Sequence, residues 1–91
     1  MNRTERRLLR LADELADLRE EERLVAGELE FHRHLHDDAA RDAAAYDTPV
    51  ERLNERDTRL DVERFERTLT RIRDRIAALE ERRAKLLQQL G

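Results

Sequence analysis

The chain has 91 residues, a net charge of −3, charged side chains at 45% of positions and aromatic side chains at 3%. This size allows one domain at most, and a composition dominated by Leu, Ala, Arg, Glu and Asp is typical of long helices rather than of a mixed fold. The absence of cysteine excludes disulfides and thiolate zinc sites. Because no apolar run could cross a bilayer and the net charge argues against general nucleic-acid binding, we expect a cytoplasmic protein with neither membrane nor nucleic-acid partners.

Apolar residues recur in steps of three and four through the first half of the chain, which predicts a helix over about residues 4–46. Gly27 conflicts with this helix at a cost of about 1 kcal/mol relative to alanine, so we expect it to mark a bend or a close helix contact. Glu22 is the polar exception in the stripe. The stripe comprises Leu8, Leu11, Leu15, Leu18, Val25, Leu29, His32, His36, Ala39, Ala43 and Tyr46.

A turn is predicted at residues 47–48, followed by a strong helix start. Thr48 suits the N-cap, and Pro49 suits the first helical position because its missing amide hydrogen needs no partner there. Glu51 stands three residues after Thr48, where its side chain can close a capping box. The second helix is therefore expected over about residues 49–90.

The second helix has a heptad stripe that only Arg83 interrupts, which is typical of a coiled coil. Because the turn is short, the two helices must lie antiparallel, so residues 1–91 form a single all-α, two-helix coiled-coil hairpin. Three groups of stripe residues then meet across the hairpin: Leu8 with Leu86 and Leu90, Leu15 and Leu18 with Ile76 and Leu79, and Leu29 with Phe65. The stripe comprises Val62, Phe65, Leu69, Ile72, Ile76, Leu79, Leu86 and Leu90.

Several large apolar residues fall outside both stripes. A two-helix hairpin has little interior, so we expect these residues to form an oligomer face, most simply one that joins two hairpins into a four-helix bundle. Alternatively, they are the scattered apolar residues that protein surfaces ordinarily carry. The predicted face comprises Leu24, Phe31, Leu35, Leu53 and Leu60.

The segment FHRHLHDDAARD, residues 31–42, contains three histidines. His32 and His36 are one helical turn apart, a spacing at which two imidazoles can bind one metal ion, with Asp61 or Glu63 as a further ligand from the second helix. Alternatively, they are half-buried stripe residues that set the register or loosen the helices when protonated. We expect no metal and no cofactor, and His32 and His36 are the candidate ligands if a metal binds.

Residues 37–61 carry eight acidic and four basic side chains, which predicts an acidic tip where the helices turn. The segment DDAARDAAAYDTPVERLNERDTRLDVERFERTLTRIRD, residues 37–74, resembles the coiled-coil arm of the DksA/TraR family and, more loosely, of the Gre transcript-cleavage factors. The resemblance implies a tip that enters the secondary channel of RNA polymerase, with Asp37, Asp38 and Asp42 as its partner-binding residues. It does not extend to that family's zinc module, since the chain has no cysteine.

Catalysis is not expected, because a two-helix rod offers no water-excluding pocket for an acid, a base or a nucleophile. We therefore interpret the chain as a non-enzymatic coiled-coil interaction or adaptor protein. It would act through self-association as a homodimer and by docking to a protein partner. The alternative is a transcription regulator whose acidic tip binds RNA polymerase.

Overall fold

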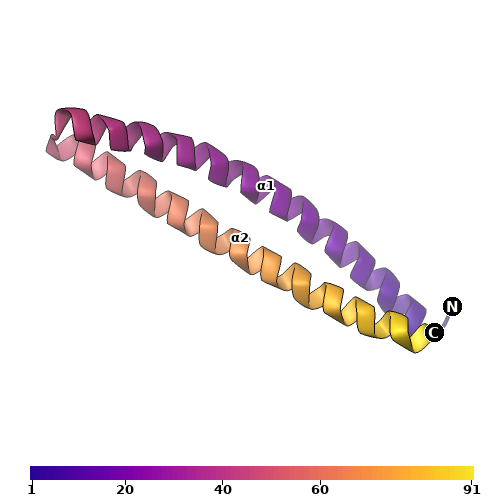
Figure 1. The fold of residues 1–91 in the computed structure, drawn as a ribbon. Coiled ribbons are helices and arrows are strands. Elements are labelled where there is room, and N and C mark those ends of the chain that lie inside the picture. Colours follow the sequence, from indigo (N-terminus) through magenta and orange to yellow (C-terminus); the bar gives the residue numbers. More distant parts are fainter. The chain divides into compact units, whose positions relative to one another are not determined.

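The computed structural model describes all of residues 1–91 and consists of two helices with no strand (Figure 1). Helix α1 spans Arg3–Tyr46 and helix α2 spans Pro49–Leu90. These bounds agree with the predicted helices to within about one residue, which is the ordinary uncertainty of helix ends. Neither helix contains an apolar stretch long enough to span a membrane.

The turn is built from Asp47 and Thr48. Asp47 adopts a left-handed backbone with φ 48°, a conformation that aspartate tolerates better than most residues. The guanidinium of Arg52 donates to both the carbonyl and the carboxylate of Asp47, each at 2.8 Å, and holds this conformation. The Glu51 amide donates to Thr48 Oγ1 at 3.4 Å, which confirms Thr48 as the N-cap. The second half of the predicted capping box is wrong, because Glu51 Oε2 is buried without a partner.

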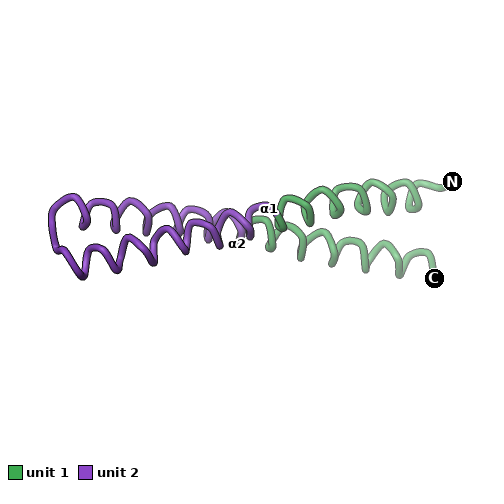
Figure 2. The backbone as a smooth tube through the Cα atoms, turned by 90° about the horizontal axis from the view of Figure 1, so that it is seen from above, with its two compact units in different colours: residues 1–23, 70–91 green, residues 24–69 purple.

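The chain divides into two compact units, each made from parts of both helices (Figure 2). Unit 1 comprises Met1–Arg23 and Thr70–Gly91 and contains both termini; unit 2 comprises Leu24–Leu69 and contains the turn. Unit 2 is therefore a complete helical hairpin, and unit 1 is a pair of helix segments.

The core of unit 1 is a leucine cluster that joins α1 to α2. Leu15 is 1% exposed and Leu79 is 0% exposed, so both are enclosed entirely by neighbouring side chains. This packing confirms the predicted register, in which Leu15 and Leu18 meet Ile76 and Leu79. The cluster comprises Leu11, Leu15, Leu79 and Leu86, with Leu8, Leu18 and Ile76 packed against it.

Ion pairs flank this core where charged side chains cross from one helix to the other. Three arginines pair with three glutamates: Arg19 with Glu80 at 2.6 Å, Arg75 with Glu14 at 2.9 Å and Arg73 with Glu22 at 3.0 Å. The last pair explains the polar exception at Glu22, whose carboxylate leaves the buried stripe to meet Arg73. Because all six side chains are partly exposed, the pairs set the register more than they add stability.

The core of unit 2 is smaller and lies away from the turn. Leu29, Val62 and Leu69 are buried, with Val25, Ala26 and Phe65 packed against them. Nearer the turn, the stripe of α1 offers only Ala39 and Ala43, and α2 offers partly buried polar side chains such as Glu55 and Thr58. The turn end of unit 2 therefore buries little apolar surface and should open more readily than the rest of the unit.

The predictions for two stripe positions are wrong, and so is one of the two alternatives for Gly27. Tyr46 and Leu90 are 68% and 47% exposed, because each is the last residue of its helix and no further helical turn covers it. Gly27 marks no close helix contact, since a Cβ built there would meet nothing within 4 Å.

We predict that Leu79→Ala lowers the free energy of unfolding by about 2–5 kcal/mol, because it leaves a cavity in the leucine cluster. Urea denaturation followed by circular dichroism measures the change. The matched control is Leu87→Ala, since Leu87 is on the same helix but 52% exposed, and it should cost less than about 1 kcal/mol. Equal losses for the two variants would contradict the assigned core.

Candidate functional site

The structure gives His32 a packing role. Its ring stacks on Phe65 of α2, with 4.6 Å between ring centroids, and meets the edge of Phe31 at 5.4 Å. Its Nε2 lies 3.8 Å from the carboxylate of Glu28, one turn earlier on α1. His32 therefore joins the two helices of unit 2 through an aromatic contact.

The other two histidines have different neighbours. His36 Nε2 lies 3.8 Å from Glu55 Oε1 across the helix pair, and this nitrogen is buried without a hydrogen-bond partner. His34 is exposed and pairs with Glu30 at 3.2 Å. No group of three or more histidine, aspartate or glutamate side chains has an arrangement that could hold a metal ion. The carboxylate beside His36 is thus that of Glu55, and neither Asp61 nor Glu63 joins His32 and His36 in the metal site considered as an alternative.

The three predicted tip residues are exposed on α1 of unit 2, roughly 6–14 Å before the helix ends at 1.5 Å per residue. Asp38 pairs with Arg41 at 2.8 Å. Asp37 and Asp42 form no ion pair or hydrogen bond. Their carboxylates are therefore free to meet a partner's cationic groups.

Asp42 also lines an open groove that was not predicted from the sequence. Helix α2 contributes Glu51 and Asp57, which like Asp42 lack an ion-pair partner. This acidic groove thus contains three carboxylates from two helices. It could be recognised only once the register of the hairpin was known. Its full lining is Asp42, Val50, Glu51, Leu53, Asn54 and Asp57.

The predicted oligomer face is exposed at all five positions but lies in two separate stripes. Leu24, Phe31 and Leu35 are spaced seven and four residues apart on α1, and each directly precedes a partly buried residue, so they flank the buried stripe. We name these three residues the apolar stripe. Leu53 and Leu60 are one heptad apart on α2, and Leu53 also belongs to the lining of the acidic groove.

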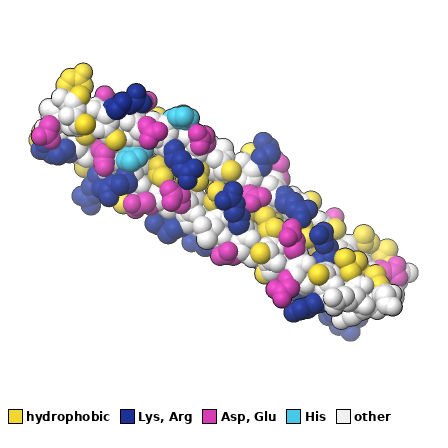
Figure 3. Space-filling model, in the orientation of Figure 1, with side chains coloured by type: hydrophobic (Ala, Val, Ile, Leu, Met, Phe, Trp, Pro, Cys, Tyr) yellow, Lys and Arg dark blue, Asp and Glu magenta, His cyan; other side chains and the backbone are white.

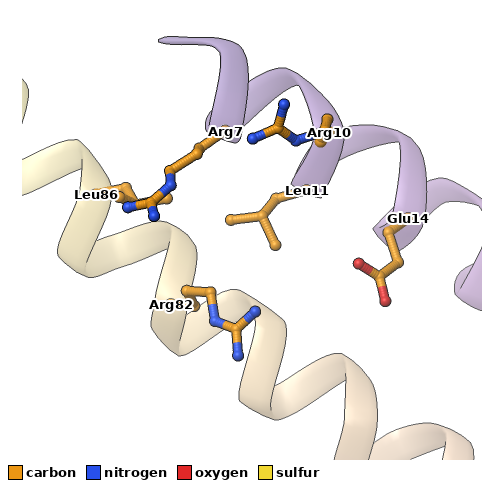
Figure 4. A pocket seen from close by; sticks show the side chains of 6 residues that line it. All are labelled: Arg7, Arg10, Leu11, Glu14, Arg82 and Leu86. Carbon is orange, nitrogen blue, oxygen red and sulfur yellow. The ribbon is translucent and has the colours of Figure 1, made fainter. Parts of the chain in front are cut away.

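Unit 1 has an open groove of the opposite charge (Figure 4). Arg7 extends from α1 toward Leu86, and Arg82 reaches from α2 toward Leu11 and Glu14. The guanidinium groups of Arg7, Arg10 and Arg82 form no ion pair or hydrogen bond, whereas Glu14 is already paired with Arg75. We name this site the basic groove. Its full lining is Arg7, Arg10, Leu11, Glu14, Arg82 and Leu86.

Sequence reasoning missed the basic groove, although the signal for it was present. The predicted register already placed Leu8 beside Leu86, which would have brought the arginine-rich start of α1 next to Arg82. Within residues 1–10 and 82–91 of unit 1 the only acidic side chain is Glu5. Residues 1–10 and 82–91 together carry seven basic side chains, although Lys85 is paired with Glu81, the residue before Arg82. The seven are Arg3, Arg6, Arg7, Arg10, Arg82, Arg83 and Lys85.

The two units differ in net charge. Unit 1 carries twelve basic and ten acidic side chains, a net charge of +2; unit 2 carries seven and twelve, a net charge of −5. Side chains of both signs alternate with apolar ones over the face in Figure 3. Paired charges on this surface still affect one another: a hydrogen bond from Arg23 lowers the pKa of Glu20 and raises the pKa of Arg23. Because both side chains are largely exposed to solvent, this pair adds little to stability.

Comparison with protein-family models, with curated proteins and with solved structures finds no match for this chain. Function is therefore inferred from its own residues. The features available for recognition are the apolar stripe and the acidic groove of unit 2, and the basic groove of unit 1.

We predict that His32→Ala lowers the free energy of unfolding by about 1–2 kcal/mol, because the stacked contact with Phe65 is lost. His34→Ala is the matched control, since His34 lies on the same helix but makes no contact with α2, and it should change stability by less than about 0.5 kcal/mol. Urea denaturation at neutral pH measures both. If His32 instead serves only as a metal ligand, the two variants should be equally stable without metal.

Proposed function

We propose that this chain is a non-enzymatic helical interaction protein that self-associates and docks to a protein partner. The observation that carries the proposal is the apolar stripe, whose three large side chains are 40–56% exposed along one side of α1. Spacings of four and seven residues are those by which a helix contacts another helix. A second copy of the chain is the simplest partner, and two helix pairs would then make a four-helix bundle.

The energy available from such a contact is modest but sufficient. Full burial of a Leu or Phe side chain is worth about 1.5–3 kcal/mol, and roughly half of this remains to be gained at each stripe position. Two copies would bury six such side chains. This gain must exceed the cost of lost rotational and translational freedom, so we expect micromolar rather than nanomolar self-association.

The absence of catalytic activity is supported by where the charged groups lie. Catalytic acids and bases lie in water-excluding pockets that shift their pKa values. In this chain the carboxylates and guanidiniums line open grooves or exposed helix faces. Such an arrangement suits the recognition of a surface.

We predict that the wild-type chain forms dimers whose fraction rises with concentration, and that Phe31→Glu with Leu35→Glu makes it monomeric. The charged side chains would have to be buried in the contact, which is strongly unfavourable. Light scattering after size-exclusion chromatography measures the mass. Circular dichroism checks that the variant stays as helical as the wild type.

The matched control is Leu9→Glu with Leu87→Glu, which replaces two equally exposed leucines in unit 1 and should leave the dimer intact. A wild-type chain that stays monomeric at millimolar concentration would refute self-association. Dimers that persist in the Phe31 and Leu35 variant would show that the dimer contact does not include the apolar stripe.

A second candidate function is favoured by the free carboxylates at the tip. Asp37 and Asp42 are exposed and unpaired near the turn, where a hairpin could carry them into a cationic or metal-containing cleft. Together with the resemblance of residues 37–74 to the DksA/TraR arm, this supports a transcription regulator that enters the RNA polymerase secondary channel.

For this candidate we predict that replacing Asp37, Asp38 and Asp42 by asparagine abolishes an effect of the chain on transcription in vitro. The substitutions remove charge without touching the buried stripes, so helicity should not fall. The matched control is asparagine at Asp13, Asp17 and Asp74, which are exposed aspartates of unit 1. An unchanged effect on transcription in the tip variant would exclude this role for the aspartates.

A further inference from the structure

The positive charge of unit 1 is concentrated in the residues near the two ends of the chain. Residues 1–10 and 82–91 carry seven basic and one acidic side chain, a net of +6, whereas the whole chain has a net charge of −3. The net charge of the chain is thus an average over regions of opposite sign. Binding to a polyanion depends on the local cluster of positive charge, because salt screens exposed charges that are more than about 10 Å apart.

The basic groove contains three of these basic side chains, and a fourth continues its edge. Arg7 and Arg10 come from α1 and Arg82 from α2, and Figure 4 shows their guanidiniums around the side chain of Leu11. Arg3 stands four residues before Arg7, so it lies on the same side of α1. None of the four arginines forms an ion pair or a hydrogen bond within the chain. Their charges are therefore available to an external anion.

The floor of the basic groove does not suit an occupant that depends on apolar contacts. Leu11 and Leu86 are only 6% and 7% exposed, so they close the floor and leave no pocket for an inserted side chain. A partner helix or peptide normally anchors itself through such a side chain. The basic groove therefore offers charge with little apolar area, which favours an occupant recognised by its charges.

The spacing of the arginines suits an extended row of anions. Arg3, Arg7 and Arg10 cover about 10 Å of α1 at 1.5 Å per residue. The phosphates along each strand of duplex DNA follow one another about every 3.4 Å of the helix axis, so a row of this length meets several of them. A guanidinium also donates two parallel hydrogen bonds, a geometry that matches a phosphate.

The position of the aromatic residues favours a duplex over a single strand. Proteins that bind single strands stack the unpaired bases on aromatic side chains. The aromatic residues of this chain are Phe31, Tyr46 and Phe65, and all of them belong to unit 2. Unit 1 therefore has no aromatic stacking surface and is suited to contact with the backbone, whose charge density is higher in a duplex.

We propose that the basic groove, together with Arg3, binds the phosphate backbone of a nucleic-acid duplex without sequence preference. Each guanidinium takes the place of a cation condensed on the phosphates, and the release of those cations drives binding. The contacts are to phosphates and not to bases, so duplex DNA and duplex RNA present the same chemistry to the groove. This inference goes beyond the proposed self-association and does not depend on it.

The test is the groove variant Arg7→Gln with Arg82→Gln, which removes one cation from each helix. Fluorescence anisotropy of a labelled duplex, as DNA and as RNA, measures the affinity of the full chain from low to high salt. For wild type on DNA, the logarithm of the affinity should fall with the logarithm of the salt concentration at a slope of about −3 to −4, since each of four phosphate contacts contributes about 0.9. The groove variant should bind at least about tenfold more weakly at low salt, with a slope near −2.

The matched control is Arg56→Gln with Arg67→Gln. Both arginines are exposed, unpaired and part of unit 2, so the control changes the net charge by the same amount outside the basic groove. It should bind the duplex like the wild type, to within about twofold, because it removes no phosphate contact. Circular dichroism checks that the groove variant and the control stay as helical as the wild type.

Each outcome supports or overturns the proposal. Binding to a DNA or RNA duplex that weakens in the groove variant but not in the control supports it. The absence of duplex binding at low salt overturns it, and so does equal weakening in the two variants, which would reflect net charge alone. A single strand, polyglutamate or anionic vesicles that bind as tightly as the duplex, at equal concentrations of negative charge, would show that the basic groove does not select a duplex backbone.

Discussion

Burial of one apolar stripe on each helix against the other is the interaction on which the rest of this structure depends. The core consists of nine buried apolar residues and no buried polar residue. Helices of this length are not held by intrinsic propensity alone, so the contact between stripes both folds the chain and sets its register. Once Leu15 meets Leu79, the backbone positions that flank this core in unit 1 follow.

This constraint explains why so much of the fold could be predicted from sequence. A heptad stripe is a direct consequence of 3.6 residues per turn. Thr48 and Pro49 indicate a helix start, because the Thr48 side chain can accept a hydrogen bond from the first turn and Pro49 has no amide hydrogen to leave unpaired there. The register followed because the two-residue turn at Asp47 and Thr48 fixes which stripe positions lie opposite each other. The errors at Tyr46 and Leu90 arise because periodicity says which side a residue faces, but not whether a neighbour is there to cover it.

The candidate site was less predictable, for a related reason. Heptad position places Cβ atoms on a side of a helix, but long side chains reach across several ångströms in directions set by rotamers and neighbours. His36 therefore meets Glu55 rather than the predicted Asp61 or Glu63, and the Glu51 carboxylate does not turn back to Thr48. The two charged grooves each take residues from both helices, so they emerge only when register and side-chain direction are known together.

Self-association would depend on apolar surfaces for its affinity and on charged surfaces for its specificity. Apolar burial supplies affinity but little direction, so a stripe as short as Leu24, Phe31 and Leu35 could pack against itself in either orientation and in several registers. Exposed charges contribute little affinity each, but they penalise arrangements that place like charges together and thereby select one. In this chain the basic groove belongs to one unit and the acidic groove to the other, so that selection favours contacts between unlike grooves over contacts between like ones. The many charged side chains would then select between possible contacts, and the exposed apolar side chains of the stripe would supply the affinity.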